Sequence, residues 1–167
     1  LSIVTDLSYM FSGCILFNAS VSGFDTSGII NMSFMFFSCR AFNQSLANFN
    51  TPNVTDMRSM FNGCWELTQS VSNFNTSNVE NMGSMFYGCS KFNQSLASFN
   101  TSKVEDMSYM FRGCNIFNQS LSGFNTSNVN TMEGMFYTCL SFNQDISGFD
   151  TSKVTNMRNM FYGANSF

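Results

Sequence analysis

The sequence has no histidine, one proline and one tryptophan among its 167 residues, and only 10% of its residues are charged. Histidine is the side chain that most often serves as a general base or metal ligand near neutral pH. Its absence excludes a histidine-dependent triad or zinc centre. The carboxylates occur singly, as at Asp25, Asp56, Glu105 and Asp150. We therefore predict no catalytic, cofactor-binding or metal-binding residue, and a protein that is not an enzyme.

Basic residues are also few, with seven Lys and Arg against ten Asp and Glu and a net charge of −3. They are scattered along the chain, whereas nucleic-acid binding needs them clustered. The sequence also lacks the roughly eighteen consecutive apolar residues of a membrane span and the plan of a signal peptide. We predict no nucleic-acid partner, and membrane association only through regions outside this sequence.

Phenylalanine and methionine are abundant, with 21 and 13 copies, and they recur every 25 residues. The pair Met-Phe begins at Met10, Met35, Met60, Met85, Met110, Met135 and Met160. Cysteine keeps the same spacing at Cys14, Cys39, Cys64, Cys89, Cys114 and Cys139, with Ala164 in the next place. A repeat of this length without insertions is typical of a solenoid.

Each repeat contains one candidate helix. Val79, Met82, Met85, Phe86 and Cys89 fall on one stripe of roughly 120° at helical periodicity, which indicates a short amphipathic helix. A Ser-x-x-Glu capping box would begin the helix at Ser77 or Ser102, whereas Thr51-Pro52 suggests threonine as the N-cap and proline at the first helical position. A left-handed glycine would end it, at Gly13, Gly63, Gly88, Gly113 or Gly163.

Each repeat also contains one candidate strand. Residues 92–96 alternate Phe92 and Leu96 with polar Asn93 and Ser95. Gln94 would then point inward, where its amide must bond to the Gln of the next repeat.

These elements predict an α/β solenoid that is leucine-rich-repeat-like, with about seven coils of 25 residues, each a short parallel strand plus a short helix. Residues 1–167 form one such unit. Because the sequence begins and ends within a repeat, we expect it to be a fragment of a longer chain that lacks its caps.

The full repeat, Phe-Asn-Gln-Ser/Asp-Ile/Leu-Ser-x-Phe-Asp/Asn-Thr-Ser-x-Val-x-x-Met-x-x-Met-Phe-x-Gly-Cys, is clearest in 92–114 and 142–161. It resembles the BspA-like leucine-rich-repeat surface proteins of bacteria and protists along the whole chain. That family commonly has Trp where this chain has Phe24, Phe49, Phe74, Phe99, Phe124 and Phe149. The resemblance implies extracellular display, adhesion or matrix roles, and no enzymatic activity.

We therefore expect an extracellular or cell-surface module that contacts other proteins or glycoproteins through an extended repeated surface. One alternative is a building block of a surface filament, appendage or wall layer that binds copies of itself. A remote alternative is an ice-binding face made by Thr26, Thr51, Thr76, Thr101, Thr126 and Thr151. Roles in turns and helix caps explain this threonine row better.

Departures from the repeat are candidate interaction residues. Trp65 occupies a loop position that holds Arg40, Ser90 or Asn115 in other repeats, which favours a partly exposed indole. A second candidate set shares one position of the repeat, beside the helix stripe: Phe37, Tyr87, Tyr137 and Tyr162. These rings either shield the flank of the helix or form an aromatic ridge that binds a partner.

The cysteines allow three interpretations. A spacing of 25 without histidine does not bring ligands to one metal ion. Neighbouring cysteines could form disulfides, although parallel side chains point alongside one another. Buried free thiols that act as small apolar side chains are the favoured interpretation, since alanine replaces one of them.

Several Asn-x-Ser/Thr sequences are candidate N-glycosylation sites if the protein is secreted by a eukaryote, and they also suit turns and side-chain ladders. They are Asn18, Asn31, Asn43, Asn53, Asn75, Asn93, Asn100, Asn118 and Asn125.

Overall fold

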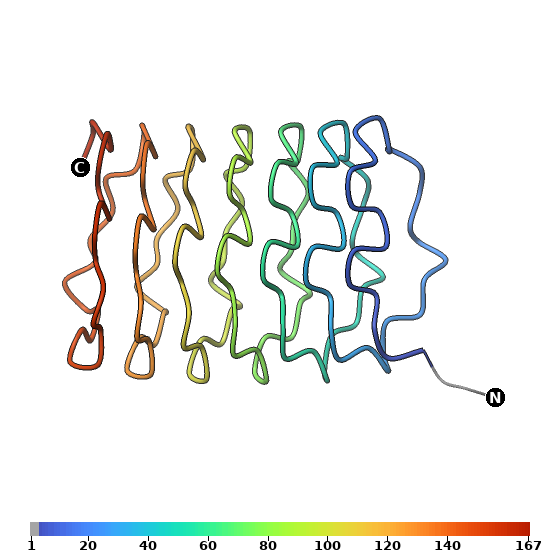
Figure 1. Ribbon diagram of the computed structural model, residues 1–167, viewed down its shortest axis with the longest axis horizontal. Helices are drawn as coiled ribbons and strands as arrows, with labels where there is room; N and C mark the ends of the chain where they lie inside the picture. Colours follow the sequence, from blue (N-terminus) through green and yellow to red (C-terminus); the bar gives the residue numbers. More distant parts are fainter. Residues whose placement is uncertain (1–3) are drawn as a thin grey trace.

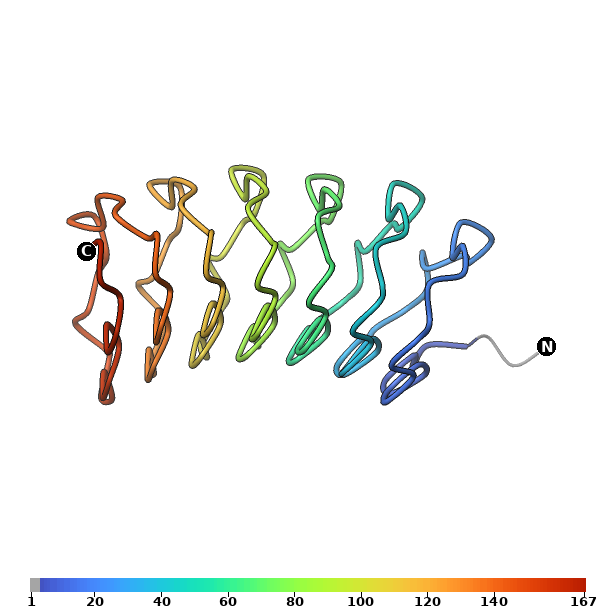
Figure 2. The same cartoon turned by 90° about the horizontal axis from the view of Figure 1, so that it is seen from above.

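The computed structural model describes residues 4–167, which form one row of coils lying side by side (Figure 1). Isolated parallel bridges link each coil to the next through Asp6, Asn31, Asp56, Asn81, Asp106, Thr131 and Asn156. We number the coils from these residues: coil 1 is 6–30, coil 2 is 31–55, coil 3 is 56–80, coil 4 is 81–105, coil 5 is 106–130, coil 6 is 131–155 and coil 7 is 156–167. Coils 1 and 7 lie at opposite ends of the row, and the coils fan slightly (Figure 2).

Residues 4–167 contain no helix, and their only β structure is these isolated bridges. The prediction of an α/β, leucine-rich-repeat-like solenoid with one strand and one helix per coil is therefore wrong. The segment predicted as a helix is a run of overlapping turns. In coil 4 the turns are closed by amides that donate to the carbonyl three residues earlier, from Met85 to Met82, from Tyr87 to Ser84 and from Cys89 to Phe86.

The backbone amides of this segment explain why no helix forms. Every second amide donates to the next coil, at N–O distances of 2.7–3.0 Å: Met82 to Asp106, Ser84 to Ser108, Phe86 to Met110 and Gly88 to Arg112. In an α-helix the same amides would donate to carbonyls four residues earlier. Because a uniform period places a carbonyl of the next coil beside each of them, pairing between coils replaces the helix.

Two left-handed residues per coil complete this geometry. Gly88 has φ of +70°, and the left-handed conformation predicted for Gly13, Gly63, Gly88, Gly113 and Gly163 is confirmed. Ser84 has φ of +57°, and its equivalents in the other coils share this conformation. A left-handed residue in mid-segment is incompatible with a continuous α-helix. The capping boxes are wrong for the same reason, and the amide of Glu105 instead donates to the carbonyl of Glu80 in the previous coil.

Residues 92–96 are not a strand, and Gln94 is half-buried rather than turned into the core. The expected ladder of amide side chains runs through the asparagine beside it. Asn93 Oδ1 accepts bonds from the backbone amide of Asn118 at 3.0 Å and from Nε2 of Gln119 at 3.1 Å.

The apolar positions of the repeat form the core, as predicted. Phe86 is completely buried, and its ring stacks on Phe61 at 5.9 Å and Phe111 at 6.0 Å in the flanking coils. Within its own coil it stacks on Phe92 at 4.3 Å. An unbroken period therefore places like rings on one another along the row.

A row of buried threonines ties the coils together on the inside. Thr76 is 1% exposed, and its hydroxyl donates to the carbonyl of Asn100 at 3.0 Å and accepts from the amide of Asn100 at 2.8 Å. The same pair of bonds recurs at Thr26, Thr51 and Thr101. These hydroxyls act within the core and present no flat face to ice.

We predict that Gly88→Ala lowers the free energy of unfolding by about 1 kcal/mol, because an L-residue pays for the left-handed conformation. Space is not the obstacle, since an added Cβ would lie 3.8 Å from Gly63. Gly123→Ala is the control: Gly123 is not left-handed and a Cβ there meets nothing within 4 Å. Urea denaturation of both variants measures the difference, and equal stabilities would contradict the assignment.

Candidate functional site

The predicted aromatic ridge exists in part and contains an arginine. Tyr87, Arg112, Tyr137 and Tyr162 occupy the same position in coils 4 to 7. The Arg112 guanidinium carbon lies 5.1 Å from the ring centre of Tyr87 and 4.2 Å from that of Tyr137. Tyr137 stacks on Tyr162 at 4.7 Å, and Tyr162 is 61% exposed. We call these four residues the aromatic–arginine row. Phe37, the remaining predicted member, is half-buried in coil 2 and lies outside this row.

A second set of aromatic side chains comes from the left-handed position and was missed at the sequence level. Tyr9 stacks on Phe34 at 4.6 Å, and Arg58 lies 5.3 Å from the Phe34 ring. Phe34 in turn lies 5.7 Å from Phe37. Tyr109 provides a third aromatic ring for Arg112, at 5.6 Å. These aromatic residues recur at one position of the repeat, and this recurrence was the available signal in the sequence. Their proximity to the aromatic–arginine row depends on a backbone turn that the residue types alone do not reveal.

Tyr109 is held in one place by its neighbours in coil 6. A Cβ at Gly134 would clash with the Tyr109 ring, so the ring lies directly over this glycine. The hydrogen bond to Glu133 raises the pKa of the Tyr109 hydroxyl and lowers the pKa of the Glu133 carboxyl. Glu133 also accepts from Nδ2 of Asn156 at 2.9 Å. The aromatic surface around Arg112 is thus pre-ordered.

Trp65 is 48% exposed, which confirms the partly exposed indole. The Arg40 guanidinium carbon lies 4.3 Å from the centre of its ring. Leu16, which is 85% exposed, and Ile15 lie in the same shallow hollow of about 300 Å³, together with Ala41 and Glu66. This Trp65 patch is a second surface suited to contact, and binding there stays a prediction.

The family profile described as "Mycoplasma protein of unknown function, DUF285" matches residues 1–99 and 55–167. The chain belongs to this family. The two matches overlap within the repeated region, in agreement with a motif that recurs throughout the sequence. The comparisons with curated proteins and with solved structures found no match.

In this DUF285 chain five of the six cysteines are buried, and Cys14 is exposed. Each buried thiol donates to a carbonyl of the preceding coil, as Cys89 does to Phe61 at 3.0 Å. Burial raises the pKa of Cys39 from 9.0 to about 11 and places that of Cys89 well above its ordinary value. The buried-thiol interpretation is therefore confirmed for Cys39, Cys64, Cys89, Cys114 and Cys139.

We predict that one thiol, Cys14, reacts rapidly with Ellman's reagent at pH 8, while the five buried thiols react only after unfolding. Alkylation followed by peptide mass spectrometry identifies the modified residue. Rapid modification of Cys89 in the folded protein would contradict the burial.

The same pKa shift predicts a dependence of stability on pH. Above pH 9 the unfolded chain releases thiol protons that the folded chain keeps. The contribution to stability is therefore complete below pH 9 and is lost as the pH rises toward 11. Urea denaturation across this range should show decreasing stability, and a flat profile would count against neutral buried thiols.

The candidate glycosylation asparagines have structural partners. Oδ1 of Asn18, Asn43, Asn93 and Asn118 accepts an amide of the next coil. Oδ1 of Asn75, Asn100 and Asn125 accepts the amide two residues ahead. Nδ2 of Asn31 and Asn53 donates to the preceding coil. Glycosylation stays a prediction.

In residues 4–167 no three His, Cys, Asp or Glu side chains are grouped so that they could hold a metal ion. The described part of the chain also has no helix with the length and apolar character of a membrane span.

Proposed function

We propose that the chain is an extracellular structural or adhesive module that contacts other proteins or glycoproteins through the aromatic–arginine row. The observation that carries this proposal is the column of Tyr87, Arg112, Tyr137 and Tyr162, in which rings and guanidinium stack across four coils. Tyrosine and arginine are enriched at protein interfaces and at the residues that dominate their binding energy. Because these side chains are already stacked, binding loses little conformational entropy.

The proposed mechanism is contact and contains no chemical step. Each coil is hydrogen-bonded to its neighbours along several backbone positions, so the row presents its side chains at a fixed spacing. Repeated weak contacts at such a spacing add up to avidity when the partner is itself repetitive. No enzymatic activity is part of this proposal.

Cell-surface location rests on the resemblance of the repeat to BspA-like surface proteins. Membership in DUF285 is compatible with this finer family, and the family description points to Mycoplasma proteins as relatives. An antibody against the chain should label intact cells of the source organism, and protease added outside the cells should remove the label. Label that appears only after lysis would refute surface display.

The contact function is tested with the double variant Arg112→Asn and Tyr137→Asn, which introduces the residue that coil 3 carries as Asn62. Binding to a panel of purified surface glycoproteins and to intact cells should fall at least about tenfold, because two central side chains are lost. Ser70→Asn with Ser95→Asn, on exposed residues outside the row, is the matched control. Equal binding by both double variants would overturn the assignment of the row.

The alternative, a building block that self-associates, is favoured by the Trp65 patch. Its exposed Leu16 and Trp65 form apolar surface that a second copy would cover. Sedimentation velocity over a wide concentration range distinguishes the two functions. Self-association that disappears in Trp65→Ser would support the assembly function, whereas a monomer at all concentrations would remove it.

A further inference from the structure

In the middle of the row, the backbone of loop 46–49 binds the side-chain NH₂ group of an asparagine in the next coil. In coil 3, Nδ2 of Asn73 reaches back to coil 2 and donates to the carbonyls of Leu46 at 3.0 Å and Phe49 at 2.7 Å, with Ala47 at 3.4 Å. In coil 2, Asn48 donates similarly to the carbonyl of Ser22 at 2.9 Å. The backbone of this loop therefore directs several acceptors at one planar donor group.

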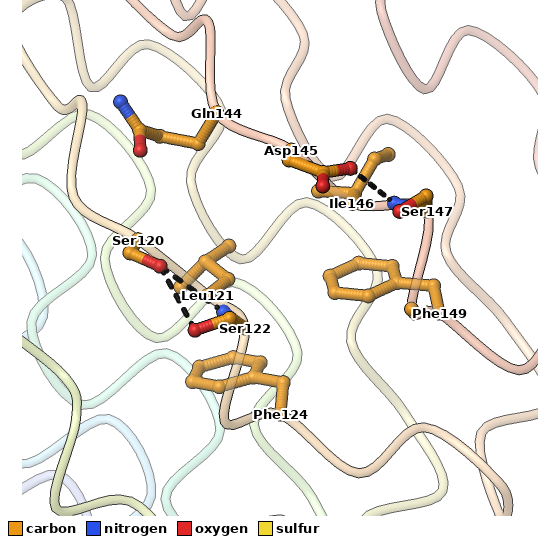
Figure 3. Close-up of a pocket in the computed structure, with 10 residues that line it drawn as sticks. Ser120, Leu121, Ser122, Phe124, Gln144, Asp145, Ile146, Ser147 and Phe149 are labelled. Atoms are coloured by element: carbon orange, nitrogen blue, oxygen red, sulfur yellow. Dashed lines mark hydrogen bonds between the residues drawn. The ribbon is translucent and has the colours of Figure 1, made fainter.

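In coil 6 the donor is missing, as it is in coils 4 and 5, where Ser98 and Gly123 stand at the same position. Gly148 stands at the position of Asn73, and a Cβ there would meet nothing within 4 Å. A cleft of about 280 Å³ lies between the loops 120–124 and 144–149 (Figure 3). The carbonyls that correspond to those of Leu46, Ala47 and Phe49 belong to Leu121, Ser122 and Phe124, all of which line the cleft.

The cleft also carries a charge that the other loops lack. Asp145 occupies the position that is serine in the five preceding coils: Ser20, Ser45, Ser70, Ser95 and Ser120. One of its carboxylate oxygens accepts the amide of Ser147 at 2.8 Å. Bonds from Ser147 lower the pKa of the Asp145 carboxyl, so that it is ionised at neutral pH. The lining contains no lysine or arginine to neutralise it.

Aromatic rings form the opposite side of the cleft. Figure 3 shows Phe124 and Phe149 facing an open centre, with Asp145 and Gln144 across from them. Phe124 is nearly buried and Phe149 is half-buried, so both rings are held in place. The cleft thus combines backbone carbonyls, one carboxylate and the aromatic side chains of Phe124 and Phe149.

We propose that the cleft between coils 5 and 6 binds a guanidinium group, from an arginine side chain of a polypeptide or from free arginine. A guanidinium is planar and carries five N–H donors, which suits a carboxylate and several carbonyls at once. It is weakly hydrated and stacks on aromatic faces. A lysine ammonium has neither the plane nor the fork of donors. The proposal uses no residue of the aromatic–arginine row and does not depend on the contact function proposed for it.

The test is an NMR titration of the isotope-labelled chain with blocked peptides of the form acetyl-Gly-X-Gly-amide. X is arginine, lysine or citrulline, which has nearly the shape of arginine without its charge. The arginine peptide should shift the amides of Ser147, Gly148 and Phe149. The citrulline and lysine peptides should bind at least about tenfold more weakly, because the charge-assisted fork is lost.

Two variants locate the site. Asp145→Ser restores the residue of the other coils and should weaken arginine binding about tenfold or more. Gly148→Asn restores the bridge made by Asn73; it should fill the cleft, abolish binding and raise the melting temperature. Asparagine fits there because Gly148 is not left-handed.

Free L-arginine is titrated alongside the peptides to identify the source of the group. Binding of the peptide supports a polypeptide source, and binding of free arginine alone supports an amino-acid source. Either result sustains the guanidinium site. The proposal is overturned if neither binds at millimolar concentration, if citrulline binds as well as arginine, or if Asp145→Ser leaves the affinity unchanged.

Discussion

Phe86→Ala is expected to lower the free energy of unfolding by about 3–5 kcal/mol, as for a fully buried phenylalanine that leaves a cavity. The ring has no exposed surface and is stacked on Phe61, Phe92 and Phe111. Collapse around the cavity is restricted, because the backbone of coil 4 is bonded to the coils on both sides. Urea denaturation followed by circular dichroism measures the loss.

The control for Phe86 is Phe167→Ala. Phe167 has the same chemistry and stacks on Phe161 at 4.2 Å, but it is 52% exposed. Its replacement should cost roughly 1 kcal/mol, since much of its surface stays in water. Similar losses of stability for the two variants would mean that the stacked phenylalanines do not stabilise the core.

Thr76→Val is expected to cost about 2–4 kcal/mol, although valine matches threonine in shape. The substitution removes a hydroxyl that bonds both to the amide of Asn100 at 2.8 Å and to its carbonyl at 3.0 Å. The Asn100 amide and carbonyl, whose bonds to Thr76 are part-buried, both lose their partner, and each such loss costs about 1–2 kcal/mol.

Thr151→Val is the matched control, because Thr151 occupies the equivalent position and is exposed. Its effect should stay within about 0.5 kcal/mol. The threonine row would lose its assigned role if Thr76→Val melted like the unchanged protein.

The period of 25 predicted the core but not the backbone that carries it. Val79, Met82, Met85, Phe86 and Cys89 are all buried, as a helical stripe requires. Overlapping turns with two left-handed residues place the same positions inward, so the stripe does not distinguish the two structures. The sequence did not reveal the left-handed conformation of Ser84, since serine has no preference for positive φ.

The threonine row shows a similar ambiguity. A threonine before a predicted helix suggests a cap, and the sequence does not reveal that its hydroxyl bonds to the next coil instead. That bond exists only because Thr76 and Asn100 are brought together by stacked coils, 24 residues apart in the sequence. Contacts between neighbouring coils depend on how the coils are aligned and on which way each side chain points. The residue types of one segment do not determine either.

The candidate sites were predictable where a residue departs from its repeat. Trp65 and the tyrosine positions were recognised in this way. Arg112 was missed because it was regarded as one of a few scattered basic residues, and its place between Tyr87 and Tyr137 emerges only from the stacking. Asp145 is also a departure, and comparing each repeat position by position would have singled it out.

The central claim is that each coil is a run of turns whose amides pair with the next coil. NMR of the labelled chain tests it most directly through nuclear Overhauser effects in 79–89. The structure predicts contacts between the amide of Ser84 and coil 5 near Ser108, because that amide donates to the Ser108 carbonyl at 2.7 Å. A continuous series of helical contacts between residues three apart across 79–89, without contacts to coil 5, would contradict the account.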